Sequence, residues 1–297
     1  MSTHGTDADG EPTDGAGTAT GDFFAGIDDY TGPAEPDTRT FARHLVTAVL
    51  VAHNGARWLP KTLTALRRLT RQPQLVVAVD TGSTDATSLL LAKALGASAV
   101  LTMPRDTGFG AAVHHAVDAG KNAPGVPAEP GIDGPVVEWL WLLHDDSAPD
   151  PESLRQLLAA VDASPSIAVA GPKVRGWSDP SQLVEVGLTV GGGGRRETGL
   201  ERHELDQGQH DGRSDVLAVG SAGLLVRRDV WDALGGFDER ITLFRDDLDL
   251  GWRANLAGHR VVVVPEAVVH HAEASAHGLR SADAVHGHVH RADRCMR

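Results

Sequence analysis

Short apolar runs alternate with amphipathic stretches along the first 171 residues of this 297-residue chain. Each run is five to eight residues long, which is typical of a buried strand. The runs lie at residues 46–52, 75–79, 98–102, 136–143 and 167–171. Between them, apolar residues recur at helical spacing, as Leu59, Leu63 and Leu66 do after the first run. This alternation predicts a mainly parallel α/β sheet with helices on both faces.

After Gly171 the pattern changes to longer apolar stretches. Strands are predicted at 183–190 and 215–228, and the loop between them is rich in glycine and charged residues. The other predicted elements of this part are helices at 228–236 and 246–258 and strands at 260–264 and 267–271.

Composition adds the domain boundaries. Residues 1–40 hold nine acidic residues against one basic residue and few periodic apolar residues, so we expect a disordered acidic tail. We expect a folded domain over 41–272, made of halves at 41–171 and 172–272, and a polar tail rich in His and Arg at 273–297.

The charge and the cysteine content limit the possible partners and compartment. A net charge of −13 argues against non-specific binding to nucleic acid. The single cysteine, Cys295, fits a reducing compartment. No apolar stretch approaches the length of a membrane span, and the N-terminus lacks the regions of a signal peptide. We therefore expect a cytoplasmic protein that can associate peripherally with the inner face of the membrane.

Two Asp-Thr-Gly sequences, which begin at Asp80 and Asp106, match the loops of an aspartic protease. In such a protease, an all-β protein, two of these loops face each other and share a catalytic proton. Here each Asp-Thr-Gly follows a predicted strand and enters a predicted helix, so both lie along one edge of a parallel sheet. This context argues strongly against the protease interpretation.

Polar residues gather at the carboxyl ends of the first four predicted strands, which is where open α/β sheets bind ligands. The segments are Ala52–Gly55, Asp80–Asp85, Arg105–Gly108 and His144–Ser147. Glycines in such loops let the backbone approach a ligand, and helix N-termini favour phosphate oxygens.

Asp145 and Asp146 are adjacent carboxylates directly after an apolar strand, so they repel each other unless something neutralises them. Capping of the next helix is the alternative role, but Asp150 and Pro151 already provide a helix start. A hard divalent cation, Mn²⁺ or Mg²⁺, prefers carboxylate oxygens and can bridge a diphosphate. We therefore favour a metal site over a solvated turn.

A second acidic cluster, Asp246, Asp247 and Asp249, lies in the first turn of a predicted helix. The helix dipole favours acidic residues there in any case, and Asp249 has the spacing to pair with Arg253. The cluster alone therefore leaves a structural role and a chemical role equally open.

Six segments, in this order, resemble the family 2 glycosyltransferases of the GT-A fold from about Val46 to His271. They are VLVAHNG, VDTGSTDAT, DTGFGAAVHHA, WLLHDDSAPDP, GSAGLLVRRDVWDALGGFDE and RDDLDLGWRANLAGHRVVVVPEAVVHH. The resemblance implies a Rossmann-like GT-A domain with a nucleotide-binding half at 41–171 and an acceptor and catalytic half at 172–272. Relatives of this family act on polysaccharides, lipids and cell-wall glycans.

The resemblance also implies roles for single residues. Asp80 matches the base-binding aspartate, and Asp146 matches the last carboxylate of the Asp-x-Asp (DXD) motif, which holds a metal on the diphosphate. Asp247 matches the catalytic base, and Asp246 stands where the family usually has Glu, so the two could exchange roles. His271 matches a histidine that often completes the metal shell. The candidates for binding the nucleotide sugar are Ala52, Asn54, Asp80, Gly82, Ser83, Arg105, Gly108 and Asp145, and those for the acceptor side are Gly220, Gly223 and Gly236.

The sequence departs from the family pattern at several of these positions. His144 stands where many members have an acid, and His270 adjoins His271, so the ligand could be either histidine. For Arg105, the sequence is equally compatible with a position on the surface and with contact to the diphosphate.

The implied reaction is a direct displacement with inversion. Asp247 would take a proton from an acceptor hydroxyl, and the metal on Asp146 and His271 would offset the charge of the departing nucleoside diphosphate. The donor would be a UDP-, GDP- or dTDP-linked sugar, and the acceptor a glycan, a polysaccharide or a lipid-linked molecule. A carboxylate next to another is expected to have a raised pKa.

Two other functions remain open from the sequence. The first is a catalytically silent nucleotide-sugar-binding or scaffolding domain of a cell-envelope glycan assembly. Its mark would be nucleotide binding without turnover, whereas the intact aspartates favour an enzyme. The second is a sugar nucleotidyltransferase, which would normally show a Gly-rich loop with Lys or Arg after the first strand. The sequence AHNGARW is a poor match to such a loop.

Overall fold

The computed structural model describes residues 43–121, 136–192, 195–241 and 244–280. The predicted disordered tail at 1–40 and the end of the polar tail at 281–297 lie outside these ranges. Within the described part of the chain, no helix combines the length and the apolar character needed to cross a bilayer.

Helices and strands alternate over residues 44–176, as the sequence predicts, except that two strands, at 137–144 and 147–149, follow each other directly. The helices are α1 (Leu59–Arg67), α2 (Thr87–Leu95), α3 (Phe109–Lys121), α4 (Ser153–Ala163), α5 (Arg228–Leu234) and α6 (Asp246–Leu256), with one 3-10 turn, η1 (Ala97–Ala99). The strands are β1 (His44–Ala52), β2 (Leu75–Asp80), β3 (Val100–Thr102), β4 (Val137–His144), β5 (Ser147–Pro149), β6 (Ile167–Gly176), β7 (Leu183–Glu185), β8 (Thr189–Gly191), β9 (Arg195–Glu197), β10 (Leu225–Arg227) and β11 (Arg260–His271).

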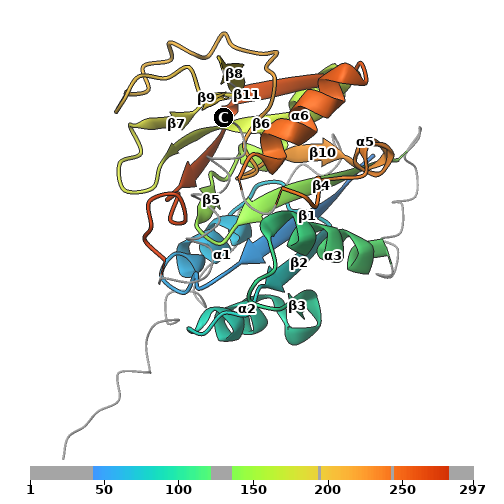
Figure 1. Cartoon of the computed structure of the whole chain (residues 1–297), viewed down its shortest axis with the longest axis vertical. Helices are drawn as coiled ribbons and strands as arrows, with labels where there is room; N and C mark the ends of the chain where they lie inside the picture. The colour runs from blue at the N-terminus through green and yellow to red at the C-terminus, as the bar shows by residue number, and fades with distance from the viewer. Residues whose placement is uncertain (1–42, 122–135, 193–194, 242–243, 281–297) are drawn as a thin grey trace, which may run out of the picture. The chain divides into compact units, whose positions relative to one another are not determined.

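The central sheet has the strand order β3-β2-β1-β4-β10-β6-β11-β5, with β7 beside β6. Strands β3, β2, β1 and β4 are parallel to one another, and β6 is parallel to β11 (Figure 1). The carboxyl ends of β2, β1 and β4 meet at one edge, because Ala52 pairs with Asp80 and Val51 pairs with His144. The predicted α/β class and mainly parallel sheet are confirmed.

Both faces of the sheet are covered by helices, and Figure 1 shows α3 and α6 in front of it. Alternate residues of the strands, such as Val49, Val77 and Leu140, are buried in one core with residues of α3, α5 and α6. On the opposite face, α4 contacts β6 and β11, and its Asp162 lies 3.1 Å from the ring of His44 in β1. Because successive side chains of a strand point to opposite faces, the two cores share the same strands.

Two predictions about local structure are wrong. The strands predicted at 183–190 and 215–228 are broken, and β7, β8 and β10 keep only three residues each. Gly187 and Gly223, with φ of +76° and +108°, turn the backbone out of the extended conformation there.

The second error concerns the start of α4. The helix begins at Ser153 without a side-chain cap, instead of being capped by Asp150. The Asp150 carboxylate instead lies 3.0 Å from Nε2 of His270, so it contacts a residue distant in the sequence and does not cap the helix.

Candidate functional site

The loops after β1 and β2 are joined by hydrogen bonds. Asn54, with a φ of +49°, accepts the Thr84 N–H and donates its own N–H to the Ser83 hydroxyl, both at 2.8 Å. The buried Asp80 accepts the Ser83 N–H at 3.0 Å, and its neighbour across the strands is Ala52. The structure thus brings four predicted donor-binding residues together. Their role in binding stays a prediction.

The other three donor-side candidates outside β4 lie further along the same edge. Gly82 has a φ of +66°, and a Cβ there would lie 2.9 Å from the backbone nitrogen of Arg105. The Arg105 guanidinium donates to the Gly82 carbonyl at 3.0 Å, so it supports the loop after β2. Gly108 precedes α3, and its carbonyl accepts the Ala112 N–H at 3.0 Å.

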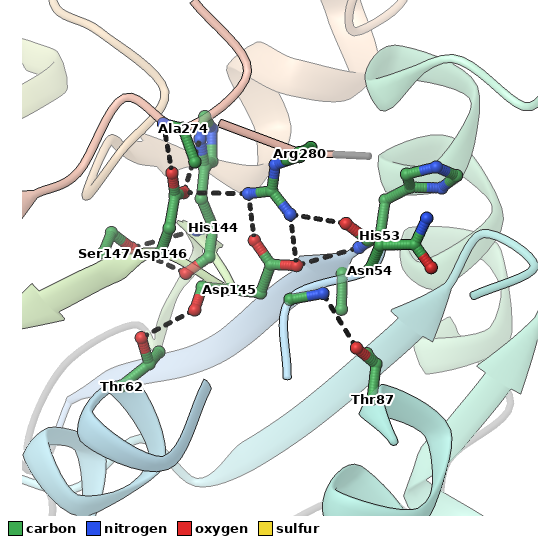
Figure 2. Close-up of polar contacts among 12 residues, drawn as sticks. His53, Asn54, Thr62, Thr87, His144, Asp145, Asp146, Ser147, Ala274 and Arg280 are labelled. Atoms are coloured by element: carbon green, nitrogen blue, oxygen red, sulfur yellow. Dashed lines mark hydrogen bonds and ion pairs between the residues drawn. The ribbon is translucent and has the colours of Figure 1, made fainter. Parts of the chain in front are cut away.

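Asp145 lies at the end of β4 and is 1% exposed. It accepts the His53 N–H at 2.8 Å, and the guanidinium of Arg280 donates to both of its carboxylate oxygens (Figure 2). A Cβ on Gly55 would lie 2.0 Å from Oδ2 of Asp145, so the absence of a side chain at position 55 leaves room for this carboxylate.

Asp146 is grouped with two histidines. Its Oδ2 accepts the Ala274 N–H at 2.8 Å, and its Oδ1 lies 3.2 Å from Nε2 of His271 and 4.0 Å from Nδ1 of His144. One possible ligand atom from each of His144, Asp146 and His271 lies within 4.8 Å of the other two. His144 therefore joins the two predicted metal residues.

The direction of the two adjacent histidines on β11 follows from strand alternation. His271 faces Asp146, whereas His270 lies 3.0 Å from Asp150. The structure thus places His271 at the site and leaves His270 outside it.

The charges in this group suit a divalent metal. Burial opposes ionisation of Asp146, but the charge and hydrogen bond of His271, together with Arg280, hold the pKa of Asp146 well below its usual range. Burial also opposes a charge on His271, yet Asp146 raises the pKa of His271. Burial and His271 lower the pKa of His144 to about 3, so this imidazole is neutral at neutral pH. The carboxylate suits a hard divalent cation such as Mn²⁺, and the two imidazoles would add nitrogen ligands once the metal displaced the His271 proton.

Asp246 and Asp247 begin α6 and are 4% and 7% exposed. Oδ1 of Asp246 accepts the Asp247 N–H at 3.0 Å, and Oδ1 of Asp247 accepts the Leu248 N–H at 2.7 Å. Oδ2 of Asp246 has no hydrogen-bond partner among the described residues. Burial and the charge of Asp247 raise the pKa of Asp246 to about 7. The predicted pair of Asp249 and Arg253 is confirmed at 2.8 Å.

A further buried carboxylate, Glu185 at the end of β7, was not predicted from the sequence. It accepts the Gly220 N–H at 2.5 Å and a guanidinium N–H of Arg196 at 2.6 Å. Burial raises the pKa of Glu185 in spite of Arg196, and the charge of Asp247 adds to the rise. Glu185 is therefore within electrostatic range of Asp247. A lone charge inside the apolar run LVEVGL is the signal that could have revealed it.

The three glycines predicted for the acceptor side lie in different surroundings. A Cβ on Gly220 would lie 2.6 Å from a carboxylate oxygen of Glu185, and Gly223 donates its N–H to the Leu142 carbonyl beside β4 at 2.8 Å. Gly236 packs against His114 and Trp231, between α3 and α5.

Arg280 was also missed. It lies after β11 in the stretch that the sequence describes only as a polar tail, where a single arginine forms no pattern. Its side chain is 10% exposed, contacts Asp145 and Asp146 directly after β4 and lies 5.1 Å from the centre of the Trp58 ring.

Comparisons with known proteins identify the family and the fold of the chain. Residues 43–284 match the model of the family described as glycosyltransferase like family 2. An N-acetylglucosaminyl-diphospho-decaprenol L-rhamnosyltransferase of Mycobacterium tuberculosis is 28% identical over 254 residues, which cover 82% of this chain and 81% of that protein. Galactofuranosyltransferase GlfT1 of Mycolicibacterium smegmatis is 25% identical over 218 residues, 72% of this chain and 66% of that protein. The crystal structure of GalNAc-T7 with UDP, GalNAc and Mn²⁺ has a TM-score of 0.54 at 15% identity, over 76% of this chain and 43% of that chain, which is a likeness of fold.

Proposed function

This chain belongs to glycosyltransferase-like family 2, and we propose that it is a metal-dependent, inverting enzyme that moves a sugar from a nucleoside-diphosphate sugar to a hydroxyl acceptor. The observation that carries the proposal is the group of His144, Asp146 and His271, which lies at the same sheet edge as Asp80. The nucleobase, bound at Asp80, would lie at the end of β2, and the metal, bound at Asp146, would lie at the end of β4. The diphosphate between them would then cross the end of β1, which separates these two strands.

Asp146, His144 and His271 would hold the metal. When bound, a divalent metal supplies positive charge that offsets the charge of the leaving nucleoside diphosphate. Asp145 would lie beside this group as a neighbouring carboxylate. Its ion pair with Arg280 and its hydrogen bond from the His53 N–H fix its position there.

Asp247 would serve as the general base. It would accept the proton of the acceptor hydroxyl while the oxygen attacks the anomeric carbon and the bond to the diphosphate oxygen breaks, which inverts the configuration. Because the pKa of Asp246 is about 7, Asp246 is partly protonated near neutral pH, and the pair carries less than two full negative charges there. Glu185 and Arg196 pair with each other within electrostatic range of Asp247, so their charges would influence the base.

The acceptor class is supported by the relative from Mycobacterium tuberculosis, whose name includes N-acetylglucosaminyl-diphospho-decaprenol, a lipid-linked sugar. We therefore propose a glycan acceptor of this lipid-linked kind and a role in cell-wall biogenesis.

Thermal unfolding tests the donor site. Wild-type protein and Asp146→Ala are heated with UDP, GDP or dTDP, each with and without Mn²⁺. A ligand at one hundred times its dissociation constant adds about 2.7 kcal/mol to the unfolding free energy, which gives a measurable shift in Tm.

A shift that requires Mn²⁺, occurs with one nucleotide and is lost in Asp146→Ala supports the proposal and names the base. The absence of any shift contradicts it. Release of nucleoside diphosphate from the matching sugar nucleotide then separates an enzyme from a catalytically silent domain.

A further inference from the structure

Arg280 connects the ends of two strands across the candidate donor site. Its Nη1 donates to the His53 carbonyl at the end of β1 and lies 2.9 Å from Oδ2 of Asp145 at the end of β4. Its Nη2 donates to Oδ1 of Asp145 and lies 3.3 Å from Oδ1 of Asp146 (Figure 2). The guanidinium is therefore held between β1 and the aspartates and not on the outer surface.

The order of the strands places this guanidinium on the path of a bound donor. Asp80 ends β2 and Asp146 follows β4, with β1 between them. A nucleotide with its base at Asp80 and its diphosphate at a metal on Asp146 must cross the end of β1. That is the position where Arg280 contacts His53.

The chemistry of the group suits exchange between a carboxylate and a phosphate. A guanidinium presents a planar fork of N–H donors that matches two oxygens of either anion. Five N–H groups are available, and Nε of Arg280 is buried without a hydrogen-bond partner among the described residues. Arg280 thus holds an unused donor in addition to those paired with Asp145.

The charge balance points the same way. With His271 deprotonated, as binding of a metal requires, Asp145 and Asp146 contribute −2 and Arg280 contributes +1, so the three charged side chains sum to −1. A divalent metal would bring the sum to +1, and the diphosphate of a sugar nucleotide, with about two negative charges, would then reverse the excess. A bound diphosphate would therefore place a second anion next to the guanidinium, beside the Asp145 carboxylate.

We propose that Arg280 is a donor-binding residue that pairs with Asp145 in the nucleotide-free protein and donates hydrogen bonds to the diphosphate when a nucleotide binds. This inference rests on the proposed donor site, and it gives the segment after β11 a direct part in recognising the leaving group.

The test compares the affinity for nucleoside diphosphates with the affinity for the corresponding monophosphates. Isothermal titration calorimetry with Mn²⁺ measures UDP against UMP, GDP against GMP and dTDP against dTMP on wild type, Arg280→Gln and Arg280→Lys. Arg240→Gln is the matched control, because Arg240 is 90% exposed and pairs with Asp238. Loss of a charge-assisted hydrogen bond is expected to reduce the preference for the diphosphate about 10- to 100-fold in Arg280→Gln, less in Arg280→Lys and not in Arg240→Gln.

A purely structural role gives a different result. Arg280→Gln would then lower the Tm of the ligand-free protein and leave the ratio of diphosphate to monophosphate affinity unchanged, which overturns the inference while the proposed function stands. If wild type binds none of the three diphosphates, the proposed function fails as well.

Because Arg280→Gln leaves a buried carboxylate without its partner, the double variant Asp145→Asn/Arg280→Gln is measured beside it. This variant replaces the ion pair by two amides of similar shape, which removes the unpaired charge. It is expected to show the same loss of diphosphate preference, and an unchanged preference in this variant also contradicts the inference.

Discussion

Two Asp-Asp pairs of the folded part of the chain, Asp145–Asp146 and Asp246–Asp247, lie in opposite surroundings. Asp145 and Asp146 follow a strand and receive hydrogen bonds from Arg280, from His271 and from backbone N–H groups. Asp246 and Asp247 begin a helix, and their carboxylates accept hydrogen bonds from the backbone N–H groups of Asp247 and Leu248 in α6. The pKa of Asp146 is held far below its usual range, whereas that of Asp246 is raised to about 7.

The comparison shows that the neighbours, and not the carboxylates, decide what each pair can do. Cations around the first pair keep Asp146 ionised and ready to bind a metal. Burial and mutual repulsion in the second pair favour the protonated form of Asp246, so this pair is suited to accept and hold a proton near neutral pH.

The largest expected effect belongs to the second pair. Asp247→Asn removes the proposed base with little change in shape, so we expect kcat to fall about 10²- to 10⁴-fold. The affinity for the nucleoside diphosphate should stay unchanged, which calorimetry checks. Asp249→Asn, in the same helical turn but paired with Arg253, is the matched control and should keep its activity. Equal losses in both variants would place the cause in the helix instead of the base.

The first pair is tested through its histidine. His271→Gln is expected to weaken Mn²⁺ binding by about 10- to 100-fold or more, because it removes a proposed ligand and the partner that keeps Asp146 ionised. His270→Gln, one residue away and directed to Asp150, should bind Mn²⁺ like wild type. Manganese binding followed by electron paramagnetic resonance gives both values. A larger loss in His270→Gln would reverse the assignment.

Asp246 predicts a pH dependence of stability. Its folded-state pKa of about 7 lies above the usual value of 3.8, so the folded protein binds more protons than the unfolded chain between these values. The unfolding free energy should therefore fall as pH rises through this window, by up to about 1.4 kcal/mol per pH unit from this group.

Asp246→Asn removes this contribution, and its stability relative to wild type should increase from pH 4 to pH 7. Urea unfolding of both proteins at several pH values measures the difference. A constant difference across the window would show that Asp246 is ionised throughout.

The smallest effect is expected at Gly55. Gly55→Ala would place a methyl group 2.0 Å from Oδ2 of Asp145, so the carboxylate must shift away from Arg280 and His53. We expect a loss of about 1–3 kcal/mol in the unfolding free energy, as for other overpacked positions. Gly120→Ala, with no atom within 4 Å of the added Cβ, should not destabilise the protein. Urea unfolding at pH 7 compares the two.

Much of the fold could be predicted from the sequence because its signals are local. The apolar runs and the helical spacing gave the order of the elements, and the end of the apolar run before His144 located the edge where Asp145 and Asp146 lie. The pair of Asp249 and Arg253 was predictable because four residues separate them on one helix.

The parts that could not be predicted depend on contacts across the chain. Arg280 contacts Asp145 across a separation of 135 residues in the sequence. His270 contacts Asp150 across 120 residues, and Asp150 therefore does not cap α4. Glu185 is buried against Gly220 because the predicted long strands break at glycines, which a period of two does not reveal.

The pairing of β11 with β6 shifts between Val264 and Val268, where residues 265–267 have no partner in β6. Such a bulge separates the alternation of side chains before it from the alternation after it. The direction of the Val263 side chain into the core therefore does not fix the direction of the His271 side chain at the site. A residue inserted into this tract would enlarge the bulge and leave His271 directed at Asp146.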